Sequence, residues 1–539
     1  MIQGETLWEL VEARAAATPD ALFAVDEHER TLTFAGYRER ALRVAAALHA
    51  RGISAGAAVS WMLPTTLEAL VLAGALARLG AVQNPILPIY RERETRFITN
   101  QTRARLLCVP PVFRNFDYHA LAQTLRAERG AQGGRRSRPT RSEPEASEGG
   151  PLHELDVLVV DGALPERDPS ALPAPPPRLA ASDQPVRWIL YSSGTTADPK
   201  GALHTDASLI ASFRGIVRVL ELGPDDRHAF VFPVTHVGGI GWLTAGLLAG
   251  FAHILVATFD PARVIPLFAR HGVTQAGAGT VFHHAYLAAQ REQPGVPIFP
   301  RVRAFPGGGA PKPPQLHYDL KREVGGIGIV SGYGLTECPI IAMNCIRDPD
   351  EKLAQTEGRQ SPPEAEIRVV RLDGGLAAPG EEGELCVRGP QLCRGYLDAR
   401  LDAAAFDEDG FFRTGDLGRL DADGYLVITG RTKDVIIRKG ENISAKEVED
   451  LLYSHPQIAD VAVIGLPDPA LGERCCAVVA CRGEPLAFAE MAAFLARAGL
   501  ARQKIPEQLE IVAEVPRNAA GKIQKQLLRE QFSPGLRAR

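Results

Sequence analysis

The feature that most constrains this fold is an alternation of two kinds of segment between residues 32 and 109. Alanine-rich stretches at residues 37–50 and 66–79 alternate with short apolar runs at residues 58–63 and 105–109. Such alternation is typical of βαβ units, in which helices connect the strands of a largely parallel sheet. An α/β fold is therefore predicted. A chain of 539 residues is also too long for one hydrophobic core, so we expect at least two domains.

The pattern of apolar and turn residues changes in the last third of the sequence. Short apolar runs separated by glycine turns predict small β elements at residues 384–387, 424–428 and 435–437. A compact α/β pattern follows, with expected helices at 445–453 and 487–500 and an expected strand at 461–465. We therefore expect a large domain over residues 1–432 and a small C-terminal domain over residues 433–539.

Residues 126–150 contain almost nothing apolar, and we expect a disordered surface insertion there. Its arginines are followed directly by acidic residues, so a solvated loop is favoured over a nucleic-acid patch. The whole chain has 60 basic and 64 acidic side chains, which offers no electrostatic argument for binding nucleic acid. A small molecule is the expected partner.

No sequence feature predicts export, a membrane span or a disulfide framework. The N-terminus has no basic start followed by an apolar run, and the apolar stretch at 238–257 is interrupted at Gly250. None of the eight cysteines forms a CxxC pair. We expect a cytoplasmic protein, as a monomer or a homodimer, and peripheral contact with a membrane stays compatible with this sequence.

The stretch YSSGTTADPKG at residues 191–201 combines a glycine, several hydroxyl side chains and a lysine directly after a strand-like run. Gly194 permits a tight turn, the hydroxyls donate hydrogen bonds and Lys200 supplies a positive charge. The order of residues differs from the Walker loop. The stretch predicts a phosphate-binding loop, and an ordinary connection between a strand and a helix is the alternative.

Five further motifs occur in order along the chain: PGGGAP at 306–311, GYGLTE at 332–337, FRTGD at 412–416, GRTKDVIIRKGENIS at 430–444 and PRNAAGK at 516–522. Together with YSSGTTADPKG they resemble the adenylate-forming superfamily, which contains acyl-CoA synthetases, luciferases and adenylation domains. The resemblance implies a large adenylate-forming domain of mixed and parallel sheets with helices, followed by a small mobile α+β domain. It also implies ATP, Mg²⁺ and coenzyme A as cofactors.

The implied reaction begins with attack of a carboxylate on the α-phosphate of ATP, which forms an acyl adenylate and pyrophosphate. Both reactants are anions, so the site needs cations and hydrogen-bond donors around the developing charge. By the resemblance, Lys522 bridges the carboxylate and the α-phosphate, Thr336 donates to that phosphate, and Glu337 and Thr196 hold Mg²⁺. His236 lies at the carboxylate end of the acyl pocket as a gate or wall, with a core histidine as the alternative.

The resemblance assigns nucleotide contacts to residues of every motif. Tyr333 is expected to stack on adenine, Asp416 to accept from the ribose hydroxyls and Arg431 to contact ribose or phosphate. The complete set of expected cofactor-binding residues is Ser192, Ser193, Gly194, Thr195, Thr196, Lys200, Gly308, Gly309, Ala310, Pro311, Gly332, Tyr333, Gly334, Asp416, Arg431, Lys433, Lys439 and Gly440.

In the second implied step, the thiol of coenzyme A displaces AMP after the small domain rotates about a hinge at Lys433. Gly440 matches the glycine that lines the pantetheine tunnel in the family. No acidic residue occurs between 233 and 242, where relatives that activate amino acids carry an aspartate, so an apolar acid is favoured. Segments 84–94 and 306–320 resemble ligases of cyclohexanecarboxylate and medium-chain acids. The expected substrate is thus a medium-chain, alicyclic or related acid of fatty-acid or lipid metabolism.

Two other functions stay open at this point. An acyl-AMP ligase would share the first step and transfer the acyl group to a separate carrier protein. An inactive nucleotide-binding relative would keep the fold alone, although such a protein would have no need of Lys522.

Overall fold

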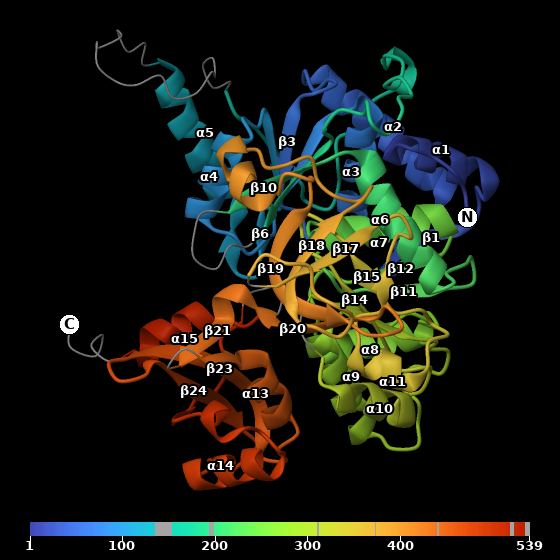
Figure 1. Ribbon diagram of the computed structural model, residues 1–539. Coiled ribbons are helices and arrows are strands. Elements are labelled where there is room, and N and C mark those ends of the chain that lie inside the picture. The colour runs from blue at the N-terminus through green and yellow to red at the C-terminus, as the bar shows by residue number, and fades with distance from the viewer. Residues whose placement is uncertain are drawn as a thin grey trace, which may run out of the picture.

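The computed structural model describes residues 1–134, 154–192, 199–309, 312–371, 373–438, 441–517 and 522–533. Figure 1 shows a large N-terminal part and a smaller C-terminal part that extends to one side of it. Helices and strands alternate in both parts. The predicted mixed α/β fold with a large and a small domain is confirmed.

The first sheet of the large part has six strands in the order β10-β9-β4-β3-β5-β8. The pairs from β9 to β8 are parallel, and β10 is antiparallel to β9. Its strands are β3 (Ala58–Trp61), β4 (Val82–Pro85), β5 (Leu106–Val109), β8 (Asp156–Val159), β9 (Trp188–Ser192) and β10 (Lys200–His204). The helices in this region are α1 (Leu7–Ala17), α2 (Phe34–Ala50), α3 (Leu67–Leu79), α4 (Glu92–Gln101) and α5 (Tyr118–Gly134).

Two four-stranded sheets, β11-β12-β1-β2 and β13-β14-β15-β16, form the second layer. Parallel bridges from His228 to Gln275 and from Gln275 to Ala304 connect them side by side. The strands are β1 (Leu22–Asp26), β2 (Thr31–Thr33), β11 (Arg227–Phe230), β12 (Ala252–Leu255), β13 (Phe305–Gly308), β14 (Ile329–Tyr333), β15 (Ala342–Met343) and β16 (Arg359–Gln360).

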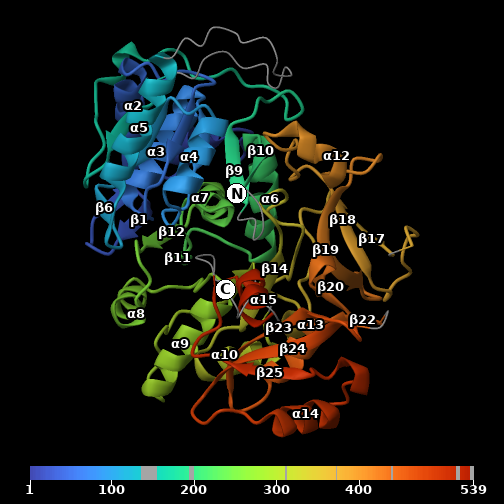
Figure 2. The same cartoon turned by 90° about the vertical axis from the view of Figure 1, so that its left-hand side faces the viewer.

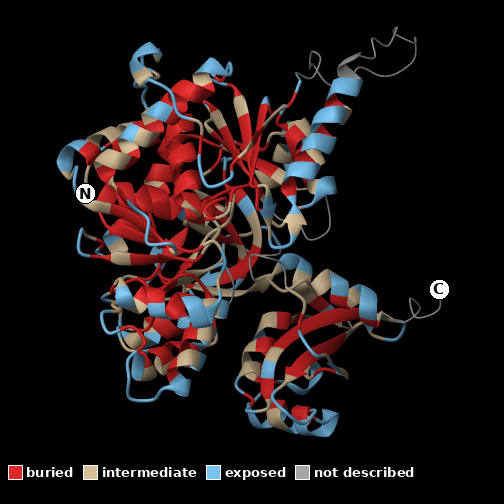
Figure 3. Ribbon diagram, turned by 180° about the vertical axis from the view of Figure 1, so that it is seen from behind, coloured by how far each residue is buried: buried red, intermediate tan, exposed pale blue. Residues whose placement is uncertain are grey.

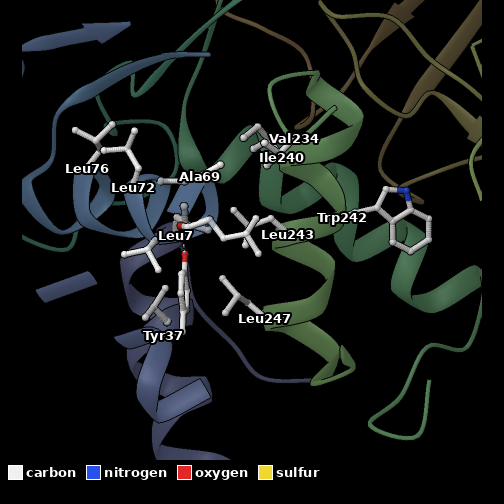
Figure 4. Close-up of a cluster of buried hydrophobic side chains, with 14 of the residues drawn as sticks. Leu7, Tyr37, Ala69, Leu72, Leu76, Val234, Ile240, Trp242, Leu243 and Leu247 are labelled. Atoms are coloured by element: carbon white, nitrogen blue, oxygen red, sulfur yellow. Dashed lines mark hydrogen bonds between the residues drawn. The ribbon is translucent and has the colours of Figure 1, made fainter. Parts of the chain in front are cut away.

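Alternate residues of this second layer face two different cores. On one face, Phe230 and Val330 pack with side chains of α6 (Asp206–Val219) and α7 (Val237–Ala249). On the other face, Ala229 and Ile329 pack with helices that lie farther along the chain. These helices are α8 (Pro261–Arg270), α9 (Thr280–Glu292) and α10 (Pro314–Glu323). Figure 4 shows how α7 meets the N-terminal helices in the first of these cores.

An antiparallel sheet, β17-β18-β19-β20, completes the large part. Its last strand lies against α13 and β22 of the small part (Figure 2). The strands are β17 (Glu366–Val370), β18 (Gly383–Arg388), β19 (Phe412–Leu420) and β20 (Leu426–Arg431). Other short elements of the large part are β6 (Val112–Phe113), β7 (Phe116–Asp117), α11 (Asp350–Gln355) and α12 (Asp402–Ala405).

The small part has a five-stranded sheet and cores of its own. These cores contain buried side chains from Ile436 onwards and none from the large part, and Figure 3 shows the buried strands at its centre. Its elements are β21 (Val435–Arg438), β22 (Glu441–Ser444), α13 (Ala445–Tyr453), β23 (Ile458–Asp468), β24 (Gly472–Cys481), α14 (Phe488–Arg497), β25 (Gln508–Ile511) and α15 (Lys525–Phe532). The boundary at residues 432/433 stays a prediction.

Two local expectations can be compared with the structure. The stretch 238–257 does divide at Gly250, which ends α7 in the left-handed conformation before β12 begins. The segment expected to be disordered from residue 126 is helical up to Gly134, because α5 continues there. Arg129 anchors this extension by donating from its buried guanidinium to the carbonyls of Ala104 and Thr99. Residues 135–150 lie outside the described part.

Among the described residues, no helix is long and apolar enough to cross a membrane. All eight cysteines are unpaired, and six of them are buried.

Gly239 fixes the start of α7, so a side chain there should destabilise the fold. A Cβ at Gly239 would lie 2.2 Å from the Pro233 carbonyl oxygen, whereas a Cβ at Gly238 would meet only the His236 ring, at 3.3 Å. We expect Gly239→Ala to lower the free energy of unfolding by about 1–3 kcal/mol through overpacking. The matched Gly238→Ala should be neutral or stabilising by up to about 1 kcal/mol, since alanine favours helices. Urea unfolding of both variants checks this; equal stabilities would contradict it.

Candidate active site

The residues of the motifs gather where β13 and β14 end. These strands run parallel, and Gly308 lies opposite Gly332. A Cβ on Gly308 would be 2.6 Å from the Gly332 carbonyl oxygen, so the two backbones approach too closely for a side chain at this position. Gly309 follows with a φ of 78° and has nothing within 4 Å of its Cβ position. The strand ends thus offer a bare backbone surface.

The turn that carries Thr336 and Glu337 is held from two sides. A Cβ on Gly334 would lie 1.9 Å from the Pro339 carbonyl oxygen, which shows how tightly the turn folds back. His204 of β10 interacts through Nε2 with the Thr336 carbonyl oxygen at 2.9 Å. The Glu337 carbonyl oxygen accepts from the backbone N–H of Cys393 at 2.8 Å. Both candidate residues are therefore fixed through their backbones.

The carboxylate of Glu337 is buried, with an exposed fraction of only 7%. The Tyr396 hydroxyl donates to Glu337 Oε1 at 2.6 Å. Burial and the Glu337 carboxylate both raise the pKa of Tyr396, so the phenol keeps its proton and stays a donor. Lys200 Nζ lies 5.4 Å from the centroid of the Tyr396 ring. A cation from the predicted phosphate loop is thus close to the pair formed by Tyr396 and Glu337.

The Asp416 carboxylate contacts two side chains from different segments of the chain. Its Oδ2 accepts from the Tyr333 hydroxyl at 2.7 Å, and its Oδ1 lies 2.7 Å from Arg431 Nε. Asp416 and Arg431 are directly opposite each other on β19 and β20. The Asp416 side chain is 4% exposed, whereas that of Arg431 is 38% exposed. The pair therefore presents a positive surface over a buried carboxylate.

Lys522 of the small part lies within electrostatic range of this cluster. Burial lowers the pKa of Lys522, and Arg431 lowers it further. The carboxylates of Asp416 and Glu337 act in the opposite direction, and Lys433 adds to the lowering. The structure thus brings the lysine of the last motif close to residues of GYGLTE, FRTGD and GRTKD.

His236 caps the N-terminus of α7, where its Nδ1 accepts from the Gly238 N–H at 3.0 Å. Its ring stacks on Phe232 with centroids 5.2 Å apart. Burial lowers the pKa of His236 to about 4, and the charge of Lys522 contributes. The ring is therefore neutral near pH 7, and its one bonded nitrogen is used by the backbone. This arrangement suits a wall of the site better than a general base.

Several predicted residues cannot be placed. Ser193, Gly194, Thr195, Thr196, Ala310, Pro311, Lys439 and Gly440 lie outside the described part of the chain. Ser192 ends β9 and pairs with Lys200, which begins β10. The predicted loop therefore joins two antiparallel strands, and the strand-to-helix alternative is wrong. Pairing between β9 and β10 places both ends of the loop side by side.

His204, Tyr396 and Cys393 support the site and were not found from the sequence. Each acts on a residue more than fifty positions away, and two of the three contacts involve backbone atoms. The only local signal is that His204 ends β10, the strand that follows the predicted phosphate loop.

Two cavities of the described chain lie away from this cluster. One, of about 810 Å³, borders Trp8 and Arg178 near the N-terminal helix; the other, of about 440 Å³, borders Arg214 and Arg394. Neither cavity is lined by a residue of the candidate site.

Comparisons with known proteins match nearly the whole chain. The sequence profile described as AMP-binding enzyme matches residues 11–397, and that of the AMP-binding enzyme C-terminal domain matches residues 447–522. The chain is 32% identical to the medium-chain fatty-acid–CoA ligase of Escherichia coli, over 96% of this chain and 89% of that protein. It is 34% identical to a salicyl-AMP ligase / salicyl-S-ArCP synthetase of Mycobacterium tuberculosis, over 98% and 91% of the two chains.

A solved structure of ATP-bound MatB from Rhodopseudomonas palustris superposes with a TM-score of 0.84. The two chains are 27% identical, and the match covers 99% of this chain and 100% of the other.

The buried histidines of the site should make stability depend on pH. Burial lowers the pKa of His204 to about 4, whereas an unfolded histidine titrates near 6.5. The unfolded chain therefore binds more protons between these values, and the free energy of unfolding should fall as pH drops from 7 to 4. His204→Gln should flatten this dependence by up to about 1.4 kcal/mol per pH unit.

Urea unfolding at pH 7.5 and pH 5.0, followed by tryptophan fluorescence, measures the slope. His119→Gln is the matched control, because His119 is exposed. A slope that His204→Gln leaves as steep as in the wild type would show that folding does not lower the pKa of His204.

Proposed function

The chain belongs to the AMP-binding enzymes and is an ATP-dependent ligase that activates a carboxylic acid as its adenylate, and we propose that coenzyme A accepts an apolar acyl group from this adenylate. One observation carries the proposal. Lys522 of the small part lies within electrostatic range of Glu337, Asp416 and Arg431 of the large part. A protein that only bound a nucleotide would not need this lysine beside its site.

The chemistry explains the distribution of charge. A carboxylate and a triphosphate repel each other, so cations must lie where the new bond forms. We propose that Lys522 contacts both the attacking carboxylate and the α-phosphate, and that Arg431 and Lys200 contact the remaining phosphate and ribose oxygens. The Thr336 hydroxyl would donate to the α-phosphate, since its backbone is already fixed by His204. Asp416 would accept from the ribose, and Tyr333 would stack on the base.

The residues present fit a magnesium ion. No group of three or more potential metal ligands occurs among the described residues. Magnesium in nucleotide sites usually takes only one or two carboxylates together with phosphate oxygens. Glu337 is a buried carboxylate of this kind, and its Oε1 accepts from the Tyr396 hydroxyl. When bound, the ion would neutralise charge on the pyrophosphate leaving group.

The surroundings of His236 favour an apolar acid. The His236 ring stacks on Phe232, and α7, which follows His236, contains no charged residue. An amino acid would leave its ammonium group without a partner there. This agrees with the E. coli relative, which is named for medium-chain fatty acids.

The second step needs a different arrangement of the small part. We propose that rotation about Lys433 withdraws Lys522 and brings Gly440 beside the pantetheine arm. Lys433 lies in a short helical turn, residues Thr432–Asp434, directly after β20. Its position between the sheet of the large part and that of the small part supports this role.

A panel of acids tests the proposed function directly. Octanoic, cyclohexanecarboxylic, salicylic and amino acids are supplied with ATP and Mg²⁺, and AMP release is measured with and without coenzyme A. We expect AMP release with the apolar acids of this panel only. This release should continue over many turnovers only when coenzyme A is present. Release that is independent of coenzyme A would favour transfer to a carrier protein, for which the mycobacterial relative is named. No turnover with any acid would refute the proposal.

Replacement of Lys522 should separate the two steps. We expect Lys522→Ala to slow ATP–pyrophosphate exchange by at least about 100-fold, because a charge in contact with the reacting groups is lost. Thioester formation from supplied acyl adenylate should stay within a few-fold of the wild type. Lys504→Ala is the matched control, since Lys504 pairs with Glu447 on the surface of the small part. Equal losses in both steps would contradict the assigned role.

A further inference from the structure

Two buried histidines on neighbouring strands have ring nitrogens without partners. His228 of β11 lies opposite His253 of β12, and their Nδ1 atoms are 3.3 Å apart. Both residues are at most 1% exposed. Within the described part of the chain, neither Nε2 atom has a hydrogen-bond partner. Buried polar groups without partners are rare in folded proteins, so this pair requires an explanation.

The environment decides which ring carries which proton. Burial lowers the pKa of both histidines, so both rings are neutral and the contact between the Nδ1 atoms needs one shared proton. His253 Nε2 is packed against α7, since a Cβ on Gly246 would lie 2.2 Å from it. A Cα–H of Gly246 therefore points at this nitrogen, which a bare nitrogen can accept, whereas an N–H would place two hydrogens against each other. We therefore assign the shared proton to His253 Nδ1, which leaves His228 with an N–H at Nε2.

This N–H lies beside the backbone segments that border the candidate site. A Cβ on Gly277 would be 3.9 Å from His228 Nε2 and 3.3 Å from the Pro306 carbonyl oxygen. Pro306 directly precedes the glycines of β13, and its carbonyl oxygen is already bonded to His283 Nε2 at 3.2 Å. The His228 donor is therefore close to the site and makes no hydrogen bond to the described residues.

Trp242 covers the ring of His228. The two rings stack with centroids 3.9 Å apart and an angle of 16° between their planes. In Figure 4, Trp242 leaves α7 on the side away from Leu243 and Leu247. Trp242 lies six residues after His236, or about 9 Å along the helix axis. A substrate whose carboxylate lies near His236 would reach this stack with the far end of a medium-length chain or a fused ring system.

We propose that His228 recognises a hydrogen-bond-accepting oxygen, such as a ring or chain ketone, at the far end of an otherwise apolar acid, with Trp242 as a flat wall. The inference rests on the proposed function, because it assumes an acyl site between α7 and the sheet. A keto acid would satisfy the buried N–H, whereas the unsubstituted acid would leave it unpaired. Sites built to bond a polar group discriminate strongly against analogues that lack it.

Matched pairs of acids and two isosteric variants test the assignment. The acids are octanoic and 7-oxooctanoic acid, and hydrindane-propanoic acid with and without a ketone on the far ring. The variants are His228→Gln, whose amide nitrogen can replace Nε2, and His228→Asn, whose amide can replace only Nδ1. The ratio of kcat/KM for the keto acid to that for its unsubstituted partner is measured by AMP release in the presence of coenzyme A.

The wild type should favour the keto acid of at least one pair by tenfold or more. His228→Gln should keep this ratio within about threefold, and His228→Asn should reduce it at least tenfold while turnover of the unsubstituted acid persists. Equal ratios for the two variants would overturn the assignment. If the His228 ring instead turns and donates to Gln275 Oε1, which has no hydrogen-bond partner among the described residues, the two variants should also give equal ratios. Turnover without any keto preference would refute this inference alone, whereas no turnover of any acid would refute the proposed function as well.

Discussion

The carboxylate of Asp416 joins the separate segments on which the site depends. It accepts the Tyr333 hydroxyl from β14 and contacts Arg431 at the end of β20, so one buried charge connects two sheets. A buried carboxylate is costly unless it is bonded, and here both oxygens are occupied. Because Arg431 directly precedes the turn that leads to the small part, this contact also fixes where the small part begins. Lys522 can approach the site only because that junction is held in place.

The site is built from backbone contacts as much as from side chains. Gly308 and Gly334 permit close approaches that any side chain would prevent. His204 and the Cys393 N–H then hold the carbonyl groups on either side of the reactive turn. The backbone of Thr336 and Glu337 is therefore fixed before any ligand binds, an arrangement that would lower the cost of organising the proposed reaction.

Much of this arrangement could be predicted from the sequence, because the motifs carry their own chemistry. The α/β class follows from the alternation of helices and strands, and Lys522, Glu337, Asp416 and Arg431 were expected to converge. The supporting residues were not predictable. His204 and Tyr396 act over long separations on a carbonyl group or one carboxylate oxygen, and such contacts leave no periodicity or spacing in the sequence. The extension of α5 to Gly134 was not predicted for a similar reason. The buried Arg129 guanidinium donates to carbonyl groups that come close to it only in the folded chain.

The contact between His204 and Thr336 has a consequence for energetics. β10 begins with Lys200 and ends with His204, so a single short strand connects the cation of the predicted phosphate loop to the turn that carries Thr336. A displacement of this strand would move both groups together. The binding energies of Lys200 and Thr336 toward a triphosphate should therefore not be independent. A double-mutant cycle between them would report a coupling energy although the two side chains need not touch.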